Sequence, residues 1–91
     1  FPEETAERFQ LTRDEAPNLA RLLVAIHAVQ SNREAQRLIA QGGVKVFAEP
    51  PDKPLSSVPE ADRSQLARTS LTPGEYKLKI GKTLFVVVTL S

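Results

Sequence analysis

Residues 31–46 read SNREAQRLIAQGGVKV and contain the signals for a helix, for both of its ends and for a following strand. The Ser31 hydroxyl can accept a hydrogen bond from the backbone N–H of Glu34 while the Glu34 carboxylate reaches back, which is the reciprocal pattern of a helix N-terminus. Gly42 suits the left-handed position that ends a helix, and Gly43 follows it without a side chain. We therefore predict a helix that begins after Ser31 and ends before Gly42.

The predicted helix has two faces of different character. Its buried stripe consists of the apolar residues Ala35, Leu38 and Ile39. Polar side chains recur at intervals of four on a separate face, where Arg33, Arg37 and Gln41 project together. The helix thus combines a side that faces the core with a basic side that faces solvent.

Regular segments are predicted before and after this helix. Residues 17–30 place apolar side chains at helical spacing, which predicts a first helix. A capping box formed by Thr12 and Glu15 indicates its start, with the helix beginning near Ala16. Residues 44–47 predict a strand in which Lys45 points opposite to its two valine neighbours.

The C-terminal residues predict a β-hairpin. Residues 76–80 alternate apolar side chains with lysines, Gly81-Lys82 supplies a turn, and residues 84–90 form a second strand. The lysines of this hairpin have two possible roles: they extend a binding surface, or they keep an exposed hairpin soluble. They are Lys77, Lys79 and Lys82.

Together these elements predict an α+β fold of two packed N-terminal helices against a small, mainly antiparallel β-sheet. We expect residues 12–91 to form one domain, since this length supports a single modest core. Residues 1–11 are expected to be a linker or a short helix from a preceding domain, because the first residue is Phe rather than Met. Residues 49–73 hold five of the seven prolines, so this loop either carries a short helical turn near 61–67 or is partly mobile.

Composition excludes several classes of function. The chain has no cysteine, which removes thiol nucleophiles and thiolate metal sites, and its one histidine, His27, has no nucleophile signature beside it. The acidic residues of the loop are too scattered for a metal site, so we expect no catalytic residue, metal or cofactor in this chain. No apolar run approaches 20 residues and residues 1–4 are too acidic for a signal peptide, so a cytoplasmic location without membrane contact is expected.

Charge is unevenly distributed along the chain. The formal net charge is only +1, which does not favour nucleic-acid binding by itself. Residues 1–17 carry five acids and two arginines, whereas residues 31–46 carry three basic residues and one acid. Residues 74–91 again carry three lysines and one acid. A nearly neutral protein can therefore present a locally positive face.

The helix, its glycine pair and the following strand resemble the S-four RNA-binding domain, named for a ribosomal protein. The end of the chain, Gly81-Lys82-Thr83-Leu84-Phe85 and three valines, further resembles the C-terminus of bacterial-type tyrosyl-tRNA synthetases. That family commonly has Asn-Gly after the strand, where this chain has Phe47-Ala48.

The resemblance implies an RNA-facing surface that recognises backbone and shape rather than base sequence. Free N–H groups at the start of the helix suit phosphate, and the neighbouring arginines add positive charge. The residues of this surface are Ser31, Arg33, Arg37, Gln41, Gly42, Gly43, Lys45 and Lys82.

The implied partner is the tRNA for tyrosine, held near its anticodon stem and variable arm. The parent would be an ATP-dependent tyrosine-tRNA ligase, expected to be a homodimer, whereas this fragment would be a monomer without catalysis. Two alternatives remain open. The same module could belong to an rRNA-modifying or ribosome-associated protein, or the chain could be a protein-interaction domain that uses its acidic start and proline-rich loop.

Overall fold

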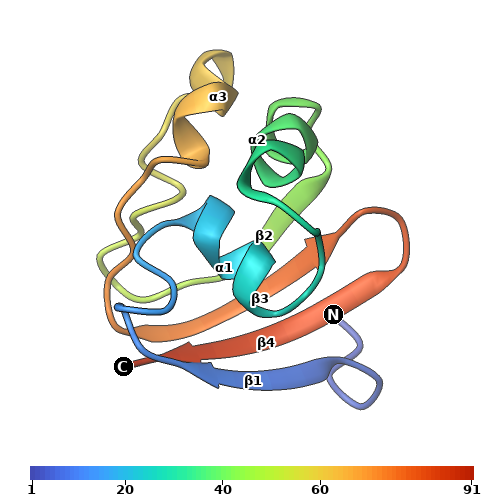
Figure 1. Cartoon of the computed structure of the whole chain (residues 1–91). Helices are drawn as coiled ribbons and strands as arrows, with labels where there is room; N and C mark the ends of the chain where they lie inside the picture. Colours follow the sequence, from blue (N-terminus) through green and yellow to red (C-terminus); the bar gives the residue numbers. More distant parts are fainter.

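A four-stranded β-sheet with helices on one face forms the frame of the molecule (Figure 1). The computed structural model describes residues 1–91, apart from the side chain of Glu60. In chain order the elements are β1 (Glu7–Leu11), α1 (Leu19–Ala25), α2 (Asn32–Ala40), β2 (Val44–Ala48), the 3-10 helix η1 (Glu60–Asp62), α3 (Arg63–Leu66), β3 (Gly74–Ile80) and β4 (Leu84–Leu90). The predicted α+β class is confirmed.

The strands lie in the order β1-β4-β3-β2, so the two edges of the sheet are formed by the two strands that come first in the chain. β3 pairs antiparallel with β2 and β4, and the predicted C-terminal hairpin is confirmed. β1 pairs parallel with β4, from Glu7 opposite Val86 to Leu11 opposite Leu90. The sheet is therefore mixed but mainly antiparallel.

Strand β1 corrects the prediction of a linker or short helix over residues 1–11. Phe9 and Leu11 pack against the core, while Arg8 and Gln10 are exposed. This alternation has the period of two expected for a strand with one buried face. The partner of β1 is β4, at the other end of the chain. Residues 1–11 alone therefore could not indicate that they pair in a sheet.

Helix α1 is shorter than the predicted span of 17–30. The capping box of Thr12 and Glu15 does form, with the Thr12 N–H donating to Glu15 Oε1 at 3.1 Å, but it closes a turn rather than a helix. Pro17 explains why α1 begins later than predicted, because the residue before a proline disfavours helical backbone. Asn18 caps the helix instead, and His27 follows its end with a left-handed φ of 62°.

The core lies between the helices and one face of the sheet. Its largest fully buried side chains include Leu19, Leu22, Leu23, Ile39, Tyr76, Leu78, Val86, Val88 and Leu90. The Tyr76 hydroxyl donates to the Thr72 carbonyl at 2.7 Å, which satisfies the polar end of a buried ring. This packing fixes which strand residues face inward and which face outward.

The proline-rich loop contains η1 and α3, which agrees with the first of the two alternatives for residues 49–73. Leu55, Ala67 and Leu71 anchor it in the core. α3 consequently lies beside α2 (Figure 1).

Candidate RNA-binding surface

The start of α2 forms as the sequence predicts. The backbone N–H of Glu34 donates to Ser31 Oγ at 3.2 Å. The Glu34 carboxylate accepts from the N–H of Gln30 at 3.0 Å, one residue earlier than in the usual capping box. The Ser31 hydroxyl therefore caps the N-terminus of α2. Arg33 and Arg37 project from a helix whose first turn is fixed by this cap.

The end of α2 is a Schellman motif. Gly42 has a φ of 76°, its N–H donates to the Ile39 carbonyl at 3.0 Å, and the Gly43 N–H donates to the Leu38 carbonyl at 2.9 Å. The Leu38 side chain occupies the space where a Cβ of Gly43 would lie, and the Arg63 guanidinium occupies the corresponding space at Gly42. The space that the two glycines leave open is therefore occupied by side chains of the protein itself, and the one against Gly42 is the positively charged Arg63.

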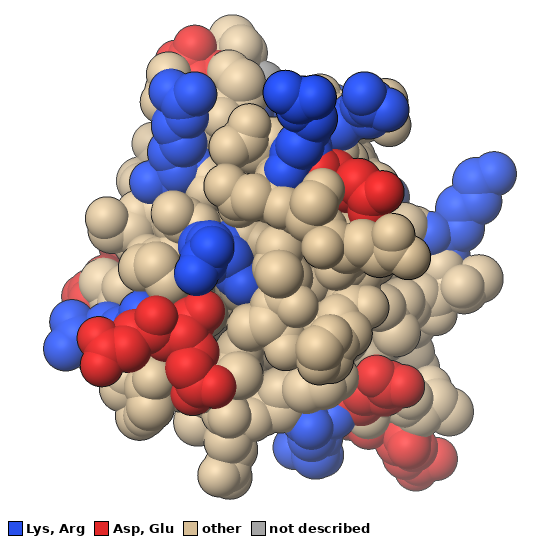
Figure 2. Space-filling view, viewed as in Figure 1, with Lys and Arg blue, Asp and Glu red and all other residues tan. Residues whose placement is uncertain are grey.

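A groove of about 380 Å³ runs between α2 and α3. Arg33 and Arg37 line it from α2, and Arg68 lines it from the segment just after α3. The remaining lining residues are small or polar: Gln36, Ala40, Ser64 and Gln65. We call this set the arginine groove. Figure 2 shows Lys and Arg side chains gathered at the top of the molecule, over α2 and α3.

The three arginines of the groove are exposed and lack acidic partners in the described part of the chain. Among the described side chains, ion pairs are formed by Lys77, with Glu3 and with Glu75. No described carboxylate lies within 4.0 Å of a guanidinium of the groove. Converging positive charges without neutralising acids favour an anionic ligand.

Two arginines near this surface were missed by the sequence analysis. Arg68 completes the groove, and Arg63 lies against Gly42 at the end of α2. Both belong to the proline-rich loop, and only the short helix α3 brings them beside α2. They are five residues apart, which is not the spacing of one helix face, so no periodic signal in the sequence marks them.

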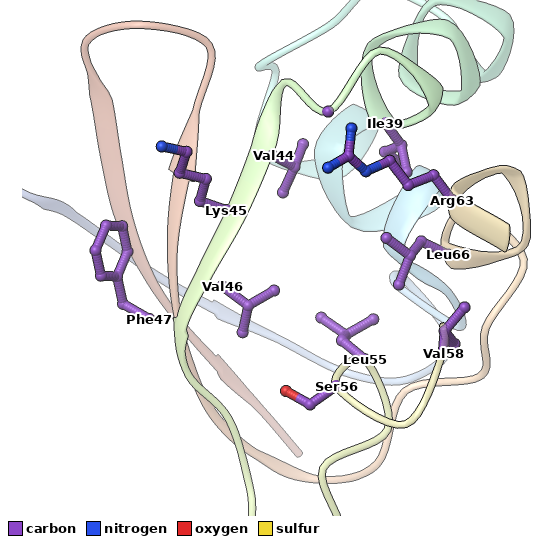
Figure 3. Close-up of a pocket in the computed structure, with 11 residues that line it drawn as sticks. Ile39, Val44, Lys45, Val46, Phe47, Leu55, Ser56, Val58, Arg63 and Leu66 are labelled. Carbon is purple, nitrogen blue, oxygen red and sulfur yellow. The ribbon is translucent and has the colours of Figure 1, made fainter. Parts of the chain in front are cut away.

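The remaining predicted residues fall at different places. Gln41 is the exposed C-cap of α2. Lys82 is exposed in the turn between β3 and β4, which the Gly81 N–H ties to the Gly43 carbonyl at 2.7 Å. Lys45 points to the opposite side of β2 from its valine neighbours (Figure 3), so it does not join the arginine groove.

A second hollow lies between β2, the end of α2 and the proline-rich loop (Figure 3). It encloses about 500 Å³, and its wall is mostly apolar, with Arg63 at one side. Among the described residues, no group of three His, Cys, Asp or Glu side chains is arranged to hold a metal ion. None of the described helices has the length and apolar character needed to cross a membrane.

Comparison of the sequence with protein-family models gave no match, and comparison with curated proteins found no related sequence.

Proposed function

We propose that this chain is an RNA-binding module and that its arginine groove contacts the phosphate backbone of a folded RNA. The observation that carries the proposal is the convergence of Arg33, Arg37 and Arg68 around one groove without described acidic partners. The planar guanidinium donates two parallel hydrogen bonds to phosphate oxygens, so three arginines on a rigid frame suit adjacent phosphates.

The frame supports recognition of shape rather than sequence. α2 is fixed at one end by Ser31 and at the other by the Gly42-Gly43 motif. Side chains on such a helix hold constant spacing, which matches the regular backbone of double-stranded RNA, whose deep major groove hides the bases. Lys82 and Gln41 extend the polar surface at the end of α2.

The resemblance of residues 31–46 and of the C-terminal residues supports a more specific proposal. The chain serves a cytoplasmic tyrosyl-tRNA synthetase as a non-catalytic appendage and binds the tRNA for tyrosine near its anticodon stem and variable arm. The amino-acid activation that uses ATP belongs to the parent protein. The same module in an rRNA-modifying or ribosome-associated protein would use the same groove on another RNA.

A binding titration with matched variants tests both levels of the proposal. Arg33→Ala/Arg37→Ala should weaken binding of a tRNA transcript by about tenfold or more, because each exposed charged contact contributes on the order of 1 kcal/mol. Arg8→Ala/Arg13→Ala removes the same charge from β1 and the following turn, and it should leave the affinity nearly unchanged. Equal loss in both variants would mean that only net charge matters.

The choice of RNA is tested separately. The tRNA for tyrosine should bind more tightly than a tRNA with a short variable arm. Equal affinity for both would support the ribosome-associated alternative. Absence of RNA binding, combined with a protein partner whose affinity does not change with salt, would support the protein-interaction alternative.

A further inference from the structure

The outer face of the sheet, opposite the helices, carries a second group of unusual side chains. Strand alternation places Lys45 of β2, Lys79 of β3 and Phe85 of β4 on this face, because their neighbours pack against the core. Phe47 of β2 joins them, since its ring centroid lies 6.4 Å from that of Phe85. We call these four residues the lysine-aromatic face. Figure 3 shows Lys45 and Phe47 projecting from the side of β2 opposite to Val44 and Val46.

Of the two aromatic rings on this face, Phe47 is open to solvent and Phe85 is half-buried. Among the described side chains, the exposed large hydrophobic residues are Phe1 and Phe47, and Phe47 is 50% exposed. The centroids of Phe47 and Phe85 are 6.4 Å apart with a tilt of 44°, so the two rings do not stack on each other. Phe1 contacts both rings, with centroid distances of 5.3 Å to Phe47 and 5.5 Å to Phe85. Phe47 therefore keeps ring surface available to a flat partner.

The position of Phe47 has a local cause. The pairing of β2 with β3 shifts between Val46 and Ala48, which makes Phe47 the extra residue of a β-bulge. A bulge turns a side chain away from the regular alternation and is common beside functional sites. Nothing in the core requires an aromatic residue here, since the side chain is half in water.

The lysines of this face are placed at a cost to the fold. Lys45 lies directly opposite Lys79 in the antiparallel pairing, where like charges repel. Neither has a described carboxylate within 4.0 Å, whereas the neighbouring Lys77 pairs with two glutamates. Lys79 Nζ lies 5.5 Å from the centroid of the Phe85 ring. A polyanion alongside the rings would remove the repulsion.

We propose that the lysine-aromatic face binds unpaired nucleotides of single-stranded RNA, with bases stacked on Phe47 and Phe85 and phosphates beside Lys45 and Lys79. Exposed rings interleaved with uncompensated lysines are the features that single-strand binding requires, because every base offers a π-face and every linkage a charge. The inference does not depend on the arginine groove, since it concerns another face and another form of RNA.

A single-tryptophan reporter tests the stacking directly. The chain contains no tryptophan, so Phe47→Trp introduces a unique fluorophore at the proposed contact. A single-stranded oligonucleotide of about 10 residues should quench its emission, with a salt-dependent affinity. Gln30→Trp, at an exposed position before α2, provides the matched reporter that should not respond. Equal quenching at both positions, or equal quenching of Phe47→Trp by inorganic polyphosphate, would overturn the proposal.

Substitutions at the ring and at the groove separate the two surfaces. Phe47→Leu keeps an apolar side chain but removes the π-face, and it should weaken oligonucleotide binding by about tenfold. Thermal unfolding of the same variant should be nearly unchanged, which shows that the fold is intact. A combined Phe47→Trp/Arg33→Ala/Arg37→Ala variant should retain the full quenching response.

Three results would contradict the proposal. Phe47→Leu could bind the oligonucleotide as tightly as the unchanged chain. The arginine substitutions could abolish the quenching, which would place the single strand in the arginine groove. Phe47→Leu could remove a concentration-dependent self-association in ultracentrifugation without affecting RNA, which would make the face a protein contact.

Discussion

The arginine groove and the lysine-aromatic face both present positive charge, but they are built differently. The groove takes its cations from α2 and from the segment after α3, and small or polar residues fill the space between them. The face takes its cations from neighbouring strands and sets them beside aromatic rings. Arginine forks on a helix suit a regular phosphate backbone, whereas lysines beside rings suit stacked single bases. A chain with a net charge of only +1 therefore presents two positively charged surfaces of different chemistry.

The largest expected effect comes from the core that both surfaces share. Leu78 is fully buried at the centre of β3, opposite Val46 and Val86. Leu78→Ala should lower the free energy of unfolding by about 3 kcal/mol, because it removes buried methyl groups and leaves a cavity. When this change is combined with Phe47→Trp and the protein is heated, tRNA binding and oligonucleotide quenching should disappear at the same temperature. Separate midpoints would show that the two surfaces belong to independently unfolding parts.

The dependence of RNA affinity on salt concentration should be steeper for the arginine groove than for the lysine-aromatic face. Three arginines in contact with duplex phosphates predict that affinity for tRNA falls about 40-fold when salt rises from about 50 to about 200 mM. Two lysines in contact with a single strand predict a fall of about sevenfold over the same range. Titrations of both RNAs at several salt concentrations measure the slopes. Equal slopes would indicate that both RNAs use the same cations.

The fold was predictable where the signals are local. The cap at Ser31 and the end at Gly42 depend on residues within a few positions of each other, and both form as expected. The C-terminal hairpin follows equally from alternation and a Gly-containing turn. Strand β1 was missed because its partner, β4, lies at the other end of the chain.

The candidate surfaces were only partly predictable for the same reason. Arg33 and Arg37 were found because one helix presents both, whereas Arg68 joins them only through the packing of α3 beside α2. Phe47 was predicted as the end of a strand and noted as a departure from the turn of the family that the chain resembles, but not as a binding residue. Its exposure and its neighbours depend on strand pairing across the sheet, which no local pattern specifies.

A smaller effect should separate the groove from the face through the cap of α2. Ser31→Ala removes the hydroxyl that accepts from the Glu34 N–H and should cost about 1 kcal/mol. Hydrogen exchange of the first-turn amides of α2 should accelerate, and tRNA affinity should fall. Oligonucleotide quenching of the Phe47→Trp reporter should not change, and Ser31→Asn, which can also cap and adds no charge, should restore both α2 protection and tRNA binding. A parallel loss of the reporter's quenching would show that the two surfaces are coupled through α2.

The smallest effect tests whether the lysine-aromatic face keeps a repulsive pair for the sake of binding. Lys45→Glu replaces a like-charge pair with an attraction to Lys79, so the free energy of unfolding should rise by about 0.5 kcal/mol at low salt. The gain should vanish at high salt, where exposed charges are screened. Oligonucleotide affinity should fall in the same variant, while tRNA binding in the arginine groove should change little. Lys45→Gln should give a smaller effect of each kind in the same direction. A loss of stability in Lys45→Glu would show that the two lysines do not repel each other, so a bound anion would have no repulsion to relieve.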